Sequence, residues 1–248
     1  MKNNIICIDL WNTIYDSYNG LERNKYRQRI LIDELDKTGT MILSDEFDRA
    51  MKATWDFFEK SWKEKHITPS AQECVEYFWK YTGSPINEKS IEIVTKAFED
   101  SVLVHKPKLI PNVEDALKEL SKNFKLAIIS DTGFSPGSIL KQLMLEDGID
   151  MYFSAFSFSN ETGFSKPNEA AFLFAINQLN GDVKQSTHIG DIEHTDILGA
   201  KKLGMNAIRF TGSATEYTSS VNNKKTDADF SSASWNEIYE YIIKYYNL

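Results

Sequence analysis

The second half of the chain alternates short apolar runs with segments of helical periodicity, and this alternation restricts the fold more than any other feature. The apolar runs are "KLAIIS", "THIG" and "NAIRF", and a helical pattern precedes each of them. Strands that alternate with helices form a parallel sheet that helices cover on both faces. The sequence therefore predicts an α/β fold built on a parallel sheet.

The same part of the chain contains further predicted elements. Helices are expected at 113–120, 168–179 and 235–246 and through Leu203, strands near 152–158 and 228–230, and a helix with Ser135 as N-cap and Pro136 as its first residue. The stretch 211–234 is rich in Ser, Thr, Asn and Lys. We expect it to be a surface excursion that contains the short strand at 228–230.

A long helical insert separates the first strand from this alternating region. Residues 5–8 form an apolar run that ends at Asp9, and residues 17–105 then show helical patterns with no strand signal, including a capping box of Ser70 and Glu73. The predicted core domain comprises 1–16 and 106–248. Because open α/β sheets bind ligands at the carboxyl ends of their strands, we expect the insert to lie over the site as a lid.

Composition excludes several classes of function. A net charge of −8 without a dense basic run argues against binding to nucleic acid. The N-terminal apolar stretch is interrupted by Asp9 and Asn12, so neither a transmembrane helix nor a signal peptide is expected. Cys7 and Cys74 are too few for a disulfide framework. We expect a cytoplasmic protein, monomeric or homodimeric, that has no membrane partner.

Polar residues stand where the predicted strands end. Asp9 follows the first strand, Ser130 ends "KLAIIS", and Asp191 follows "THIG", with Asp196 five residues later. Lys166 lies in a loop just before a helix. Carboxylates, a hydroxyl and an ammonium at one sheet edge suggest an anionic substrate together with Mg²⁺, which prefers oxygen ligands.

Four motifs in order make the chain resemble the haloacid dehalogenase-like superfamily. They are "DLWNT", "AIISDTG", "SKPNEAAF" and "HIGDIEHTDILGAKKLGM". The resemblance implies a Rossmann-like core, and it implies that the helical insert, residues 17–105, is an all-helical cap domain of the C1 type. It also implies that Asp9 is the nucleophile, Ser130 the hydroxyl that binds the phosphoryl group and Lys166 the third motif's cation.

The resemblance further implies Mg²⁺-dependent hydrolysis of a small phosphorylated metabolite through an aspartyl-phosphate. The expected metal group comprises Asp9, the backbone carbonyl of Trp11, Asp191 and Asp196. Thr13 is expected to hold the loop that follows Asp9. The candidates for substrate contact are Thr13, Tyr15, Asp131 and Thr132.

Trp11 departs from the phosphatase pattern, in which this position is usually a second Asp that transfers protons. An indole N–H donates a hydrogen bond but cannot shuttle a proton. The related 2-haloacid dehalogenases also lack that Asp, yet "GDIEHTD" keeps the form of the motif that binds metal. A phosphatase is therefore favoured over a dehalogenase or an inactive ligand-binding protein. His194 is a weaker candidate for the missing acid, because it can equally be a first-turn helix residue.

Overall fold

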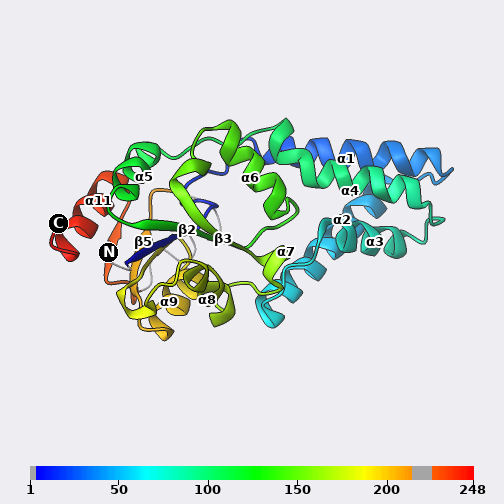
Figure 1. Ribbon diagram of the computed structural model, residues 1–248. Helices are drawn as coiled ribbons and strands as arrows, with labels where there is room; N and C mark the ends of the chain where they lie inside the picture. Colours follow the sequence, from blue (N-terminus) through cyan, green and yellow to red (C-terminus); the bar gives the residue numbers. More distant parts are fainter. Residues whose placement is uncertain (1–3, 214–224) are drawn as a thin grey trace. The chain divides into compact units, whose positions relative to one another are not determined.

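The predicted strands form one parallel sheet in the computed structural model, which describes residues 4–213 and 225–248 (Figure 1). The strands are β1 (Ile5–Ile8), β2 (Lys125–Ser130), β3 (Phe153–Phe158), β4 (Thr187–Gly190), β5 (Asn206–Phe210) and β6 (Phe230–Ser232). Their order is β3-β2-β1-β4-β5-β6, and every neighbouring pair is parallel. The α/β prediction is confirmed, and all strands point their carboxyl ends to one edge.

Helices cover both faces of this sheet because β1 is apolar and buried along its whole length. One face packs on α8 (Glu169–Gln178) and α9 (Leu198–Lys202), in a core that includes Cys7, Ala127 and Phe172. Helices α5 (Val113–Ser121) and α11 (Trp235–Tyr245) contact each other and lie on the other side of the sheet (Figure 1). The shorter elements are η2 (Asp150–Tyr152), α7 (Ser159–Thr162), η3 (Val183–Gln185) and η4 (Glu193–Ile197).

Strand β6 begins two residues later than the predicted strand at 228–230. Asp229 donates its backbone N–H to the carbonyl of Ala207 (2.8 Å), but its carboxylate accepts the N–H of that residue (2.8 Å). The carboxylate of Asp229 thus accepts the N–H of Ala207, which a backbone carbonyl would accept in a regular strand pair. Regular pairing with β5 starts only at Phe230. Residues 214–224 of the predicted surface excursion lie outside the described residues.

The chain divides into two units. A core unit contains residues 1–18, 107–131 and 144–248, and a helical unit contains residues 19–106 and 132–143. The helical unit is built from α1 (Gly20–Lys37), α2 (Ser44–Lys60), η1 (Ser61–Lys65), α3 (Ala71–Thr82) and α4 (Glu88–Val104). The apolar faces of α1, α2, α3 and α4 share one core, and the capping box of Ser70 and Glu73 is confirmed at the start of α3.

Residues 132–143, which the sequence division assigned to the core, group with the helical unit. Phe134 explains this, because its ring lies 5.2 Å from that of Phe98 and 5.7 Å from that of Phe58, centroid to centroid. Ser135 does not cap the following helix as predicted. Its hydroxyl donates instead to the backbone carbonyl of Glu99 in α4 (2.7 Å).

That following helix, α6, comprises Gly137–Glu146, so Pro136 precedes it. The backbone carbonyl of Pro136 accepts the first hydrogen bonds of the helix, from the N–H groups of Ile139 and Leu140 (3.0 Å each). Among the described residues, no helix has both the length and the apolar character needed to cross a membrane.

Candidate active site

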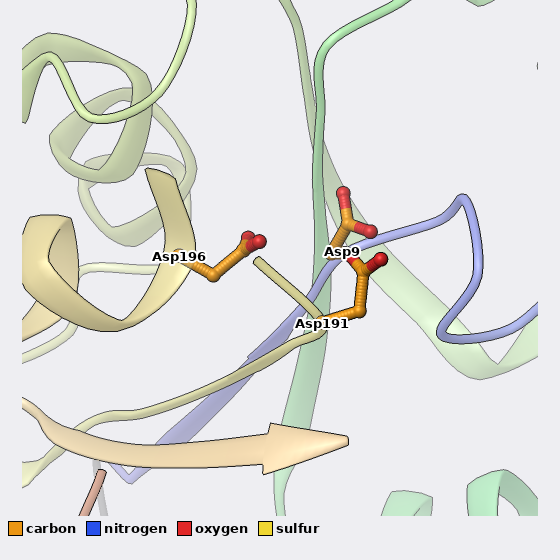
Figure 2. Close-up of side chains that lie close together, drawn as sticks. All are labelled: Asp9, Asp191 and Asp196. Carbon is orange, nitrogen blue, oxygen red and sulfur yellow. The ribbon is translucent and has the colours of Figure 1, made fainter. Parts of the chain in front are cut away.

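The ends of β1 and β4 bring two carboxylates together at the carboxyl edge of the sheet. Asp9 follows β1 and Asp191 follows β4, and these strands are paired with Ile8 opposite Ile189. The N–H of Asp9 continues the pairing by donating to the carbonyl of Ile189 (2.9 Å). Figure 2 shows both side chains beside Asp196, and one carboxylate oxygen from each of the three lies within 4.8 Å of the others.

Asp196 reaches this cluster from η4, the turn that follows β4. Its carboxylate lies against the α-carbon of Gly190, where an added Cβ would come within 2.3 Å of the Asp196 Cγ. That distance is too short for any side chain. The glycine of "HIGD" is therefore required by the close approach of Asp196.

Lys166 joins the carboxylates from the loop before α8. Its Nζ lies 2.5 Å from Oδ1 of Asp9 and 2.7 Å from Oδ1 of Asp196. The backbone N–H of Lys166 donates to Oδ1 of Asp131 (3.0 Å), which ties this loop to the end of β2. The lysine and the three carboxylates are all buried. The structure thus brings together four residues that the sequence singled out in three separate motifs.

Burial and mutual charge shift the pKa values in this cluster. Burial raises the pKa of Asp9 to about 7, with the Lys166 ammonium opposing the shift and the charge of Asp196 adding to it. Burial and the two neighbouring carboxylates likewise raise the pKa of Asp191 well above its usual value. Burial also acts on Asp196, but the Lys166 ammonium and the hydrogen bond from His188 outweigh it and lower the pKa of that carboxyl. Asp196 is therefore the most firmly ionised of the three.

Two of the carboxylates have oxygen atoms that suit a hard cation. Oδ2 of Asp191 is buried and accepts no hydrogen bond from the described residues. Oδ2 of Asp9 accepts one long hydrogen bond, from the hydroxyl of Thr13 (3.3 Å). A buried, unpaired carboxylate oxygen is costly unless a cation or another donor meets it. These oxygens fit Mg²⁺, which binds through one or two carboxylates and keeps several waters.

The loop after Asp9 is held by the core unit. Trp11 is half-buried and forms an isolated bridge with Tyr15. The backbone carbonyl of Thr13 accepts the indole N–H of Trp235 (2.9 Å), and the buried hydroxyl of Tyr15 donates to Oδ2 of Asp147 (2.8 Å). Trp235 and Asp147, which are far apart in the sequence, therefore both hold this loop.

The other predicted site residues lie at or beyond the end of β2. Ser130 is buried, and its hydroxyl lies 3.4 Å from the backbone carbonyl of Asp131. Asp131 itself is half-buried. Thr132 is buried and belongs to the helical unit. His194, the weaker candidate for a proton donor, is exposed on η4.

His188 is a residue of this cluster that the sequence reasoning did not single out. It lies fully buried in β4, and its Nε2 is 2.9 Å from Oδ1 of Asp196. Its ring packs on Phe172 of α8 in a T-shaped arrangement, with centroids 5.0 Å apart. A titratable residue inside a buried strand, three positions before a motif aspartate, is the signal that could have indicated it.

Comparison with known proteins places the chain in a family. A family model for haloacid dehalogenase-like hydrolases matches residues 4–204. The chain therefore belongs to the haloacid dehalogenase-like hydrolases, as its four motifs predicted.

Curated relatives in this family include phosphatases. A glyceraldehyde 3-phosphate phosphatase of Methanothermobacter thermautotrophicus is 34% identical over 109 residues, which are 43% of this chain and 46% of the relative. A pyrimidine 5'-nucleotidase of Escherichia coli is 35% identical over 98 residues, 39% of this chain and 42% of the relative. The matched segments span less than half the length of these two relatives.

Solved structures share the whole fold at low sequence identity. A 2-haloacid dehalogenase from Pseudomonas syringae superposes with a TM-score of 0.72 at 19% identity, covering 99% of this chain and 100% of the other. A phosphatase of the family from Thermococcus onnurineus gives a TM-score of 0.65, also at 19% identity and covering 98% of both chains. At this identity the likeness establishes the fold alone.

Proposed function

We propose that this protein is a Mg²⁺-dependent hydrolase of a small phosphorylated metabolite. The observation that carries the proposal is the contact between a buried lysine and the aspartate after β1, Lys166 Nζ to Asp9 Oδ1, within a cluster of three carboxylates. Phosphoryl transfer needs a nucleophile in line with phosphorus and positive charge around the phosphoryl oxygens. These residues offer both within one buried site.

In the proposed reaction, Asp9 attacks phosphorus. A carboxylate oxygen forms a bond to phosphorus while the bond to the leaving oxygen breaks, which gives an aspartyl-phosphate that water then cleaves to inorganic phosphate. Lys166 stabilises negative charge on the phosphoryl oxygens, and the Ser130 hydroxyl donates to one of them. Because the site already holds the Asp9 carboxylate in position, little further orientational freedom is lost when it attacks phosphorus.

The carboxylates of Asp9 and Asp191 and the backbone carbonyl of Trp11 would hold the metal. Mg²⁺, when bound, supplies charge that offsets the negative charges of substrate and nucleophile. A backbone carbonyl is offered by any residue, so Trp11 is compatible with this ligand set. The four hydrogen bonds that Asp196 accepts favour a different role for that residue, which is argued below.

The names of the curated relatives support a phosphate monoester as the substrate class. They act on glyceraldehyde 3-phosphate, on pyrimidine 5'-nucleotides and, for a relative from Halopiger xanaduensis that is 24% identical over 181 residues, on ribulose 1,5-bisphosphate. All three are small phosphorylated molecules. We further propose, from the family resemblance, that the helical unit acts as a cap domain of the C1 type.

The proposal is tested by assaying a panel of phosphate esters with and without Mg²⁺. Wild type should release phosphate only with the metal, and Asp9→Asn should abolish turnover because an amide does not displace at phosphorus. The matched control is Asp48→Asn, which makes the same change at an exposed position on α2 and should retain wild-type activity. Activity of Asp9→Asn within a few-fold of wild type would contradict the covalent mechanism.

The same panel addresses the alternative functions. Release of halide from 2-haloacids without Mg²⁺, and no release of phosphate, would favour a dehalogenase. Absence of turnover on both substrate classes would favour a protein that only binds its ligand.

A further inference from the structure

All four hydrogen-bonding positions of the Asp196 carboxylate are occupied by protein donors. Oδ1 accepts from Lys166 Nζ (2.7 Å) and His188 Nε2 (2.9 Å). Oδ2 accepts from the backbone N–H of Ile192 (3.1 Å) and the hydroxyl of Thr195 (3.2 Å). An ionised carboxylate has about four lone-pair sites, so Asp196 has none to spare for a cation. Its contacts suit a residue that positions other groups.

The group that Asp196 positions is the ammonium of Lys166. The same Nζ atom bridges Oδ1 of Asp196 and Oδ1 of Asp9, and all three side chains are buried. The direction of the ammonium therefore depends on where the Asp196 carboxylate points. The two donors on Oδ2 hold one of its oxygen atoms, and His188 shares the other with Lys166.

His188 is well suited to fix that second oxygen. The residue lies in β4, between β1 and β5, and its ring packs on Phe172 in a T-shaped arrangement. An ionised carboxylate only accepts hydrogen bonds, so the proton of a neutral His188 lies on Nε2. Its Nδ1 is buried and accepts no hydrogen bond from the described residues, which leaves the contact with Asp196 as the polar interaction of this ring.

We propose that His188 is a positioning residue of the reaction: its Nε2–H fixes the Asp196 carboxylate, which in turn holds the Lys166 ammonium against Asp9. This inference rests on the proposed function, since it concerns the same site. Among the described residues, the His188 ring makes its hydrogen bond to Asp196 and none to Asp9. It acts through one hydrogen bond to one carboxylate oxygen, in the way that outer partners orient the ligands of a metal site.

The experiment compares four His188 and Phe172 variants with wild type, using p-nitrophenyl phosphate and Mg²⁺. His188→Leu removes the donor and should lower kcat by roughly 10- to 100-fold with little change in KM, since the lost orientation matters in the transition state. His188→Gln places an amide N–H near the position of Nε2 and should recover most of the lost kcat. His188→Asn has the same amide on a shorter side chain that does not reach Asp196, so it should remain low.

Phe172→Leu is the packing control, because it loosens the other side of the ring and leaves the donor in place. It should lower kcat less than His188→Leu does, because it weakens the packing of the ring but keeps the donor itself. Thermal unfolding of each variant shows which ones fold. If His188→Leu does not fold, the kcat values of His188→Gln and His188→Asn test the positioning role. These two side chains carry the same amide and differ only in their length.

The outcomes separate this inference from the proposed function. If wild type hydrolyses the ester and a folded His188→Leu keeps the wild-type kcat, or changes only KM, the positioning role is overturned and the function stands. A kcat of His188→Gln that is no higher than the kcat of His188→Asn would also overturn the positioning role. If wild type hydrolyses no phosphate ester with Mg²⁺, the proposed function fails and the inference fails with it.

Discussion

Two aspartates of the same motif have different surroundings, although only five positions separate them. Asp191 has a buried carboxylate oxygen that accepts no hydrogen bond from the described residues, whereas both oxygens of Asp196 accept two hydrogen bonds each. A buried carboxylate oxygen that accepts no hydrogen bond is available to a cation, whereas an oxygen that already accepts two hydrogen bonds is not. We therefore assign Asp191, together with Asp9, to the metal and Asp196 to Lys166 in the proposed mechanism.

Many phosphatases of the family have an aspartate at the position of Trp11. Replacing Trp11 with aspartate tests how much activity the absence of this acid costs. Trp11→Asp should add a proton donor for the leaving oxygen while the backbone carbonyl at this position stays available. An alkoxide needs protonation as it leaves and a nitrophenolate hardly does, so activity on alkyl phosphates relative to nitrophenyl phosphate should rise by up to ~10². Steady-state rates on both substrates give this ratio.

Stability of the Trp11 variant must be measured beside its activity. Trp11 is half-buried, and removing a buried ring can cost ~3 to 5 kcal/mol. Trp11→Phe keeps an aromatic ring without adding an acid, so it is the matched control and should leave the ratio unchanged. If a folded Trp11→Asp variant that binds Mg²⁺ shows the wild-type ratio, position 11 is not the site of a missing acid.

At the scale of elements, the segment after β2 links the two units of the chain. Ser130 and Asp131 belong to the core unit, and the next residues belong to the helical unit. Phe134 packs on rings of α2 and α4, and the guanidinium of Arg27 lies over its ring, 4.9 Å from the centroid. The motif that carries the proposed phosphoryl-binding hydroxyl is thus covalently continuous with a segment packed in the helical unit.

The hydrogen bond from Ser135 to Glu99 offers a direct test of that packing. Ser135→Ala removes a buried donor and should lower the free energy of unfolding by about 0.5 to 1.5 kcal/mol. Ser138→Ala, the same change at an exposed position of α6, should stay within about 0.5 kcal/mol of wild type. Urea unfolding midpoints compare the two variants, and equal midpoints would show that the contact contributes nothing to stability.

At the scale of the whole molecule, the raised pKa of Asp9 makes stability depend on pH and on metal. Burial raises this pKa from the usual 3.8 to about 7, so between about pH 4 and pH 7 the folded state holds a proton that the unfolded state releases. Because the folded state binds more protons there, this carboxyl destabilises the metal-free protein progressively as pH rises through that window. Asp191 has a raised pKa and acts in the same direction.

We therefore expect Asp9→Asn to be more stable than wild type without Mg²⁺, by an amount that grows from about pH 5 to about pH 8. Added Mg²⁺ should raise the Tm of wild type more at the higher pH, because the metal binds the ionised carboxylate and competes with the proton. Calorimetric scans at both pH values, with and without the metal, measure these differences. A difference between wild type and variant that does not change with pH would contradict the raised pKa.

Much of the fold followed from local patterns. Apolar runs of strand length and helical spacing predicted β2, β4, β5, α5 and α11, because these periods arise from the geometry of each element by itself. The start of β6 and the role of Ser135 were missed. Both depend on partners far along the chain, Ala207 for the first and Glu99 for the second.

The sequence by itself determined that this chain is a haloacid dehalogenase-like hydrolase with a parallel α/β core, since four short motifs and their spacing are properties of the chain alone. Only the tertiary structure decided which groups of those motifs meet. The contact of Lys166 with Asp9 requires the strand order, and the contact of Asp196 with His188 and Lys166 requires its close approach to Gly190. Such contacts join residues up to 157 positions apart, and no local period encodes them.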